Sequence, residues 1–445
     1  MPKITHRKKR LSSFKLIVLG FAGVIVLGAL ILMLPFSSTA RVVTPFHEAL
    51  FTSTSAVCVT GLVVQDTGSY WSAFGQTVIL LLIQIGGLGV VTVAALFAML
   101  SGRKISLMQR STMQDAISAP KVGGIVRLTR FIVRGTFLIE LIGMIVMLPT
   151  FCGNYGFKGI WMAAFHSVSA FCNAGFDILG TAENKYPSLT GYIGNPAINI
   201  TIMLLIIVGG IGFLTWDDIY TNKWHFKKYR MQSKVILVTT AILIIAPAVF
   251  FFFCDFTGLP LAERILASLF QSVTPRTAGF NTADLPAMTG SSKAIMTLLM
   301  LVGGSPGSTA GGMKTTTLAV LILSAFSVCR KKDDAEVCGR RIDGSAVKNA
   351  AAVAVMYFLL FFVGGIVIST AEGLPLSTCL YETASAVGTV GLTLGITPQL
   401  GVLSQLILIV LMYLGRVGGL TLIYAAISNK NQGGAKLPLE KITVG

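Results

Sequence analysis

Eight apolar stretches, each about as long as a membrane-spanning helix, dominate this sequence of 445 residues. A helix needs about 20 mainly apolar residues to cross the hydrocarbon core of a bilayer. Only 12% of the residues are charged, about half the share in a soluble domain, so an ordinary soluble enzyme is excluded. The stretches are Phe14–Phe36, Phe74–Leu100, Phe131–Phe151, Ile198–Ile219, Val235–Phe253, Ile295–Phe326, Ala351–Thr370 and Leu403–Ile427. They predict an all-α integral membrane protein with eight transmembrane spans.

The basic residues gather in alternate connections between these stretches. Of the 35 Lys and Arg residues, 27 lie in the N-terminus, in the loops after the second, fourth and sixth stretches, and in the C-terminus. Since such residues stay on the cytoplasmic side, both termini are predicted to be cytoplasmic. This topology accounts for the net charge of +17 without a nucleic-acid partner. The seven cysteines have no CxxC spacing and predict neither a zinc site nor a disulfide framework.

Four loops on the predicted outer side share one pattern. An aromatic residue begins a short apolar run rich in hydroxyl groups, which ends in a glycine followed by Leu or Phe. The copies are residues 51–62, 165–176, 270–280 and 381–392, and the span after each carries a glycine pair: Gly86-Gly87, Gly209-Gly210, Gly303-Gly304 and Gly418-Gly419. Four copies in register predict four pseudo-repeats, with boundaries at residues 1–110, 111–230, 231–340 and 341–445.

The short apolar run of each copy is predicted to be a half-helix. About 12 residues at 1.5 Å each reach about 18 Å, roughly half of a 30 Å hydrocarbon core. Pro45, Pro260 and Pro375 stand near the start of three copies, as proline does in the first turn of a helix. The chain must then return as non-helical backbone, which is tolerated at membrane depth only where protein buries it or it lines an aqueous path.

Four such loops around one axis would form a ring of carbonyl oxygens. Carbonyls can replace the hydration shell of a cation without a fixed charge, so the ion can also leave. Each half-helix would point its negative C-terminal end toward the ion, and glycine permits successive carbonyls to face the same side. The predicted ion-binding residues are Val59, Thr60, Gly61, Asn173, Ala174, Gly175, Thr277, Ala278, Gly279, Thr389, Val390 and Gly391. The segment from Thr389 to Leu392 is similar to the TVGYG filter of potassium channels.

The sequence resembles the Trk/Ktr/HKT superfamily of potassium transporters, and its bacterial KtrB branch most closely. The segments that carry the resemblance run from Val273 to Asn281 and from Val302 to Thr315. The resemblance implies four repeats of a channel subunit around one central pore, potassium uptake, and a homodimer in the bacterial plasma membrane. It also implies a cytosolic octameric ring of KtrA type that carries ATP or ADP, stimulation by Na⁺, and no covalent cofactor. Gly61 stands where some plant relatives have a serine linked to sodium permeation, which implies selectivity for K⁺.

The sixth apolar stretch is interrupted by glycines and a proline, which cost about 1 and about 3 kcal/mol relative to alanine inside a helix. The resemblance implies a gating loop below the filter, whereas a static kink is the alternative. Arg416 lies deep in the last stretch, where an unpaired arginine costs at least about 2.5–3.5 kcal/mol. It is predicted to face the pore, bind carbonyls of the interrupted segment and raise a barrier; a structural salt bridge is the alternative. The predicted gate comprises Gly303, Gly304, Ser305, Pro306, Gly307, Ser308, Thr309, Ala310, Gly311, Gly312, Lys314 and Arg416.

Other polar residues of the spans and loops have weaker assignments. Glu140 is expected to pair with Arg134 or a neighbouring lysine in preference to an ion, and Arg276 is expected to pair structurally. Four residues on the half-helices are expected to brace the filter from behind: His47, Glu48, His166 and Glu382. Three acids follow filter glycines and either attract cations to the mouth or are solvated rim residues: Asp66, Asp177 and Asp284.

Three other functions were weighed against a channel-like pore. Residues 307–315 resemble a phosphate-binding P-loop, but Met313 separates the glycine from the lysine that should follow it directly, and no buried strand precedes the segment. An intramembrane hydrolase would need a nucleophile with its base, and no such set stands out. A secondary cation symporter with alternating access is the closest alternative, and would show two halves with two broken helices where this sequence suggests a single broken span.

Overall fold

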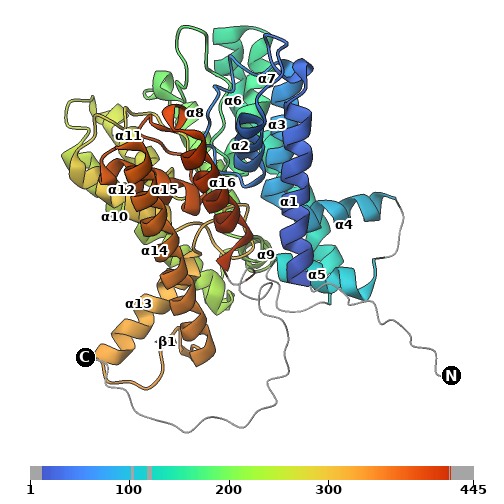
Figure 1. The fold of residues 1–445 in the computed structure, drawn as a ribbon. Coiled ribbons are helices and arrows are strands. Elements are labelled where there is room, and N and C mark those ends of the chain that lie inside the picture. The colour runs from blue at the N-terminus through green and yellow to red at the C-terminus, as the bar shows by residue number, and fades with distance from the viewer. Residues whose placement is uncertain (1–12, 102–104, 118–122, 420, 422–445) are drawn as a thin grey trace, which may run out of the picture.

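The computed structural model describes residues 13–101, 105–117, 123–419 and 421, and almost all of its regular elements are helices (Figure 1). Four helices are long and apolar enough to cross a membrane: α1 (Ser13–Leu32), α6 (Ile125–Tyr155), α10 (Met231–Cys254) and α14 (Gly344–Glu372). Each lies near the start of one predicted repeat. The end of the predicted last span, together with both termini, lies outside the described residues.

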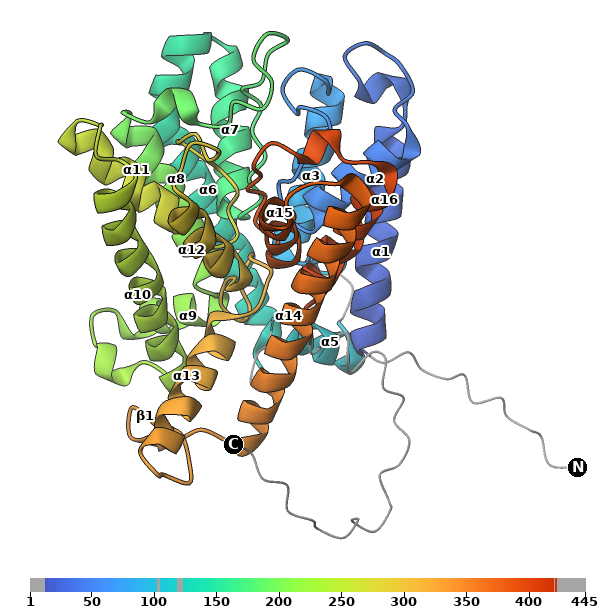
Figure 2. The same ribbon diagram turned by 60° about the vertical axis from the view of Figure 1, so that its left-hand side comes forward.

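Four shorter helices lie at the predicted half-helix segments. They are α2 (Phe46–Val57), α7 (Lys158–Phe171), α11 (Leu261–Val273) and α15 (Leu376–Gly388). Pro45, Pro260 and Pro375 directly precede three of them and have extended backbone dihedrals, so each proline begins its helix sharply. In each repeat the half-helix packs against the long helix before it, for example α7 against α6. Figure 2 shows α15 near the middle of the molecule, between α12 and α14.

The second helix is broken in three of the four predicted repeats, so the expectation of a single broken span is wrong. The pair α3 (Ala73–Leu88) and α4 (Val90–Leu100) bends by 96°, and the pair α8 (Pro196–Gly210) and α9 (Phe213–Asn222) bends by 99°. Residues 302–314 separate α12 (Gly290–Leu301) from α13 (Thr315–Cys329), and α16 (Val402–Val417) ends at Gly418.

Gly418 has the same backbone geometry as the first two breaks. The φ and ψ angles are 84° and 134° at Gly89, 89° and 141° at Gly212, and 87° and 139° at Gly418. Glycine adopts this region readily because it has no Cβ, whereas other residues are strained there. Hydropathy reports only that a segment is apolar, so it could not distinguish these bends from straight spans.

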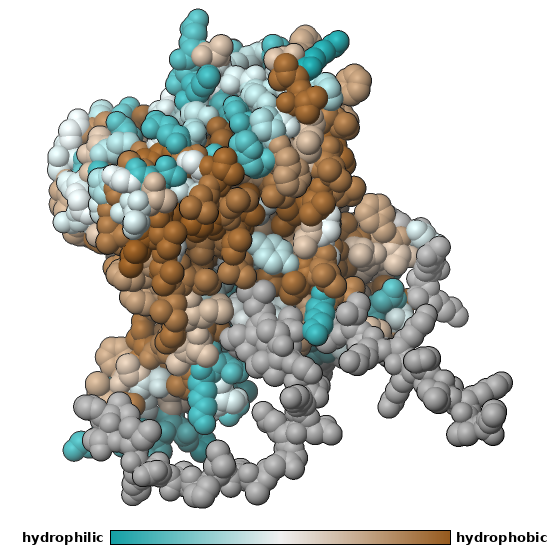
Figure 3. All heavy atoms as spheres, viewed as in Figure 1, coloured by the Kyte–Doolittle hydropathy of each residue, from teal (hydrophilic) through white to brown (hydrophobic). Residues whose placement is uncertain are grey.

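The remaining elements lie mainly at the two ends of the molecule. They are α5 (Leu107–Ile117), the antiparallel strands β1 (Glu336–Val337) and β2 (Arg340–Arg341), and four short 3₁₀ helices: η1 (Pro35–Ser37), η2 (Thr190–Tyr192), η3 (Phe226–Lys228) and η4 (Thr397–Gln399). Figure 3 shows a hydrophobic band between hydrophilic ends on the face in view. Exposed side chains such as Leu138, Ile242 and Phe358 give the long helices a lipid-compatible outer face. The chain is therefore a multi-pass membrane protein.

Candidate ion pathway

The four glycine loops have the same unusual backbone conformation. The residue two positions before each glycine has a positive φ: 52° at Val59, 58° at Asn173, 80° at Thr277 and 53° at Thr389. The glycines themselves have φ values of 89° at Gly61, 69° at Gly175, 78° at Gly279 and 93° at Gly391. Side chains other than glycine seldom adopt such dihedrals, so four matching occurrences indicate one repeated local structure.

The four loops close a ring around one axis, which we call the glycine ring (residues 59–61, 173–175, 277–279 and 389–391). A Cβ added to any of the four glycines would collide with the carbonyl oxygen before the glycine of the next loop. The distance from the added Cβ to that carbonyl oxygen would be 2.4 Å from Gly61 to Ala174, 2.5 Å from Gly175 to Ala278, 2.3 Å from Gly279 to Val390, and 2.2 Å from Gly391 to Thr60. Because the fourth loop returns to the first, all four surround a common centre.

A hydroxyl group at the end of each half-helix holds its loop in place. The backbone N–H groups of Gly61 and Gly391 each donate to a serine hydroxyl, Ser55 and Ser385, over 3.0 Å. In the other two copies, the hydroxyls of Ser169 and Thr274 donate to the carbonyls of Phe176 and Phe280 instead. These four residues were not singled out from the sequence, although each lies six positions before its glycine, or five in the third copy.

The segment 302–314, which we call the inner loop, lies against the ends of the half-helices on the inner side of the glycine ring. A Cβ on Gly311 would lie 2.2 Å from the side-chain oxygen of Thr389, which belongs to the ring. The hydroxyl of Thr309 donates to the carbonyl of Phe171 at 3.1 Å, and the N–H of Ser305 donates to the carbonyl of Gly210 at 2.9 Å. The inner loop is thus placed directly below the ring.

Arg416 contacts the inner loop through its guanidinium group. Nη1 donates to the carbonyl of Thr309, and Nη2 donates to the carbonyls of Gly86 and Gly87, the latter at 3.2 Å. Within the described residues no carboxylate pairs with Arg416, so a structural salt bridge does not account for it there. The ammonium group of Lys314 donates to the carbonyl of Ala310 at 2.8 Å. Two half-buried cations therefore bind the backbone around the inner loop.

One glycine in the second helix of three repeats makes room for the end of the half-helix. A Cβ on Gly86 would lie 2.1 Å from the carbonyl of Val57, and a Cβ on Gly415 would lie 2.2 Å from the carbonyl of Val387. Gly209 meets Phe171 in the same way. In the fourth predicted repeat this contact is made by Gly415. The predicted pair Gly418-Gly419 lies beyond the contact, at the helix end.

Two buried charged residues have partners other than those expected. The carboxylate of Glu140 accepts a hydrogen bond of 3.0 Å from Gln84, whereas Arg134 is exposed about two helical turns earlier. The expected ion pair of Glu140 is wrong within the described residues, because the side-chain amide of Gln84 on α3 reaches the carboxylate instead. Arg276 reaches the hydroxyl of Thr240 at 3.4 Å and has no carboxylate partner in the described part of the chain.

Two glutamates on the half-helices tie them to the loops beyond the ring. Glu48 accepts a hydrogen bond of 2.9 Å from Gln65, and Glu382 accepts hydrogen bonds from Thr397 at 2.9 Å and from the N–H of Leu394 at 3.2 Å. Both carboxylates thus brace the outer side of a glycine loop.

The two histidines of the half-helices have different surroundings. The ring of His166 stacks on Phe151 with a centroid separation of 5.1 Å and is fully buried. His47 is partly exposed and lies 3.9 Å from the carboxylate of Glu48. The packing of His166 fits a bracing role, and that of His47 places it at the outer surface of α2.

The three acids beyond the ring also differ from one another. Asp66 is buried and accepts hydrogen bonds from the N–H of Ser69 at 2.8 Å and of Tyr186 at 3.0 Å, so it is a structural link and not a solvated rim residue. Asp284 is exposed. Asp177 is half-buried, and burial raises its pKa to about 7 with a further increase from the negative charge of Asp66.

Comparison with known proteins places this architecture in a family. The family described as "TrkH: Cation transport protein" matches residues 22–434. Potassium/sodium uptake protein NtpJ of Enterococcus hirae is 39% identical over 98% of both chains. Ktr system potassium uptake protein B of Bacillus subtilis is 38% identical over 92% of both chains.

A solved structure has the same fold. The potassium transporter TrkH of Vibrio parahaemolyticus superposes with a TM-score of 0.74, at 19% sequence identity, over 96% of this chain and 87% of that one. With a family match over most of the chain and two relatives near 40% identity, this protein belongs to the TrkH family of cation transport proteins.

Proposed function

We propose that this protein is the membrane subunit of a potassium-selective, channel-like uptake transporter, in which K⁺ passes through the glycine ring. The closure of the four loops into one ring is the observation that carries this proposal. Backbone carbonyls from four directions suit a dehydrated monovalent cation, and the half-helix C-termini add negative partial charge. Each of the four predicted repeats would supply two crossings and one loop, which gives eight crossings around one pore.

Selectivity for K⁺ is proposed from the ring and from the relatives. Glycine occupies the key position in all four loops, including Gly61. The relatives in Enterococcus hirae and Bacillus subtilis are named for potassium uptake, and the first also for sodium. A negative interior is worth about 2.3 kcal/mol per charge per 100 mV, so an open pore would carry K⁺ inward.

The inner loop is proposed as the gate, with Arg416 and Lys314 as its cations. Its backbone blocks the axis below the ring, and the guanidinium of Arg416 adds a positive charge on the ion path. Glycine-rich backbone that is held by a few hydrogen bonds can leave this position at modest cost. Opening would move the inner loop away from Thr389 and the end of α7.

A regulated assembly is proposed from the name of the Bacillus relative, which describes component B of a Ktr system. The chain would form a homodimer in a bacterial plasma membrane with both termini in the cytoplasm. It would bind a cytosolic octameric ring of KtrA type, and that partner would carry ATP or ADP. Sodium would act as a stimulating ion.

Rubidium uptake into vesicles that carry the purified chain tests the proposed function. Uptake should follow an imposed inside-negative potential, and external K⁺ should inhibit it more strongly than Na⁺. Electrical recordings separate a pore from the alternative symporter, because only the pore would give unitary currents. Strict coupling of Rb⁺ flux to a second cation would favour the symporter. The breaks in the second helices do not favour it, because within the described residues they occur in three of the predicted repeats and not in two.

Loosening the inner loop should increase rubidium uptake. In Thr309→Val the side chain keeps its volume but can no longer donate to the carbonyl of Phe171. A hydrogen bond contributes about 0.5–1.5 kcal/mol, so initial uptake should rise roughly 2- to 10-fold. Ser308→Ala is the matched control, because the buried hydroxyl of Ser308 has no partner among the described residues. Equal uptake by the two variants would contradict the gating role of the Thr309 contact.

Uptake should also depend on the external pH through Asp177. Its raised pKa of about 7 means that the carboxyl group is negative above pH 7 and becomes neutral below it. The titratable group that faces Asp177 is Asp66, whose carboxylate accepts a hydrogen bond from the backbone N–H of Tyr186. Rubidium uptake at subsaturating concentration should fall as the external pH decreases from 8 to 6. Asp177→Asn should remove most of this dependence and hold uptake near the low-pH level, whereas an unchanged profile would exclude Asp177 as its source.

A further inference from the structure

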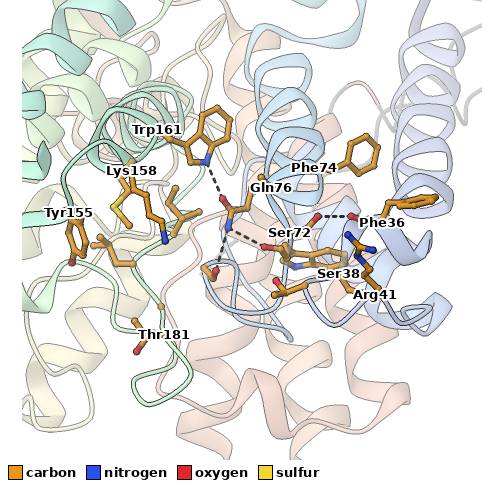
Figure 4. A pocket seen from close by; sticks show the side chains of 18 of the residues that line it. Phe36, Ser38, Arg41, Ser72, Phe74, Gln76, Tyr155, Lys158, Trp161 and Thr181 are labelled. Atoms are coloured by element: carbon orange, nitrogen blue, oxygen red, sulfur yellow. Dashed lines mark hydrogen bonds between the residues drawn. The ribbon is translucent and has the colours of Figure 1, made fainter.

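A large cavity lies away from the glycine ring, between the outer ends of the first two repeats (Figure 4). Its volume is about 1080 Å³, slightly above the range of about 300–1,000 Å³ for small-molecule sites. Phe36 follows the end of α1, Phe74 begins α3, Tyr155 ends α6, and Trp161 lies in the first turn of α7. The cavity is therefore framed by the ends of helices from both repeats.

A hydrogen-bonded network forms the floor of the cavity, although the buried indole N–H of Trp71 has no partner within the described residues. The indole N–H of Trp161 donates to the side-chain oxygen of Gln76 at 3.0 Å, and the amide of Gln76 donates to the carbonyl of Trp71 at 3.1 Å. Trp71 is almost fully buried. These bonds cross from the second repeat to the first, so the cavity has a defined shape before any ligand enters.

Two cationic side chains at this cavity have no hydrogen-bond or ion-pair partner within the described part of the chain. They belong to Arg41 and Lys158, and both are exposed. Figure 4 shows them on opposite sides of Gln76. No aspartate or glutamate is among the residues that line the cavity. The charge is therefore complementary to an anion, whereas the walls are mainly aromatic and aliphatic.

The loop that carries Arg41 is fixed by its own hydrogen bonds. The hydroxyl of Ser38 donates to the carbonyl of Val42 at 2.8 Å and accepts from the N–H of the same residue at 2.9 Å. Arg41 lies inside this turn with a φ of 54°. The backbone position of Arg41 is thus set by a closed turn beside η1.

We infer that this cavity binds an anionic phospholipid of the outer leaflet, with the phosphate between Arg41 and Lys158 and the acyl chains along Phe36 and Phe74. The inference rests on the proposed function, since that gives the cavity its place at the outer membrane surface. Tryptophan and tyrosine concentrate at this depth, and Tyr155 and Trp161 line the cavity together with Phe36, which is 72% exposed. Basic pockets between membrane helices bind the headgroups of anionic lipids. The bound lipid joins the outer loop of the first repeat to the start of α7.

Native mass spectrometry of the full-length protein in detergent tests this inference, with phosphatidylglycerol or phosphatidylcholine added in a titration. The protein should retain at least one phosphatidylglycerol and bind it at least about tenfold more tightly than phosphatidylcholine, which lacks net charge. The double variant Arg41→Gln/Lys158→Gln should lose this preference. The matched control Lys185→Gln/Lys293→Gln removes two positive charges on the same side but away from the cavity, and should retain it.

Three results would overturn the inference. The first is equal retention of phosphatidylglycerol by the double variant and its control. The second is displacement of the lipid by inorganic phosphate at comparable concentration, which would identify a phosphate site. The third is cross-linking of Phe36→Cys between two copies of the chain, which would show that a second copy covers the cavity. Lipid retention does not depend on ion flux, so a failure of the proposed transport function would be seen separately in rubidium uptake.

Discussion

Replacing Gly391 with alanine should reduce rubidium uptake at least about 100-fold. The added Cβ would lie 2.2 Å from the carbonyl oxygen of Thr60 and 3.0 Å from the Cα of Gly61, so the first loop would have to move. The φ of 93° is a further strain for any residue with a side chain. In the proposed mechanism the carbonyl oxygens replace the hydration shell of the ion. A carbonyl displaced in one of the four loops should therefore leave the ion poorly coordinated and block transport.

Gly395→Ala is the matched control for this variant. Gly395 belongs to the same outer loop and has a φ of 91°, but a Cβ added there meets no atom within 4 Å. Its alanine variant therefore carries a similar backbone strain without the collision. Both variants should be compared at equal amounts in the membrane and with their unfolding temperatures measured. Near-normal uptake by a folded Gly391→Ala protein would exclude this ring as the ion path.

Replacing Arg416 with alanine should raise rubidium uptake about tenfold or more. The guanidinium holds the inner loop through the carbonyl of Thr309 and holds α3 through the carbonyls of Gly86 and Gly87. Hydrogen bonds to charged groups contribute about 1.5–3 kcal/mol, and 1.4 kcal/mol corresponds to a factor of ten. The variant also removes a positive charge from the proposed path of the cation. Initial rates in vesicles at a fixed potential provide the measurement.

Arg416→Lys separates the two contributions. Lysine keeps the charge but has no planar fork, so it cannot bind Thr309 and Gly86 together. If charge dominates, the lysine variant should stay close to the natural protein; if the hydrogen bonds dominate, it should approach the alanine variant. Unchanged or lower uptake by Arg416→Ala, at equal amounts of protein, would refute a barrier at this position.

The repeated glycine pattern made the ring predictable from the sequence. Gly61, Gly175, Gly279 and Gly391 each follow a short apolar run at nearly equal spacing, and local sequence is enough to fix a half-helix and a turn. The contact between Gly391 and Thr60 joins the fourth glycine loop to the first. It was inferred only because four equal units around one axis require it.

Other features depended on contacts that no local pattern reports. The bends at Gly89 and Gly212 lie in segments of uninterrupted hydropathy, where a glycine is equally common in a straight packed helix. The partner of Glu140 is Gln84, 56 residues earlier, and the helix packing that joins them is set by the whole fold. Arg41 and Lys158 similarly meet over one cavity only after two repeats have packed together.

The location of the ion is the central claim of the proposed function. A crystal structure of the protein grown with Rb⁺, with data collected at the rubidium absorption edge, tests it most directly. The account predicts anomalous density on the axis of the glycine ring, within coordination distance of the carbonyls of Thr60, Ala174, Ala278 and Val390. Density confined to another part of the molecule, with the axis empty, would contradict it.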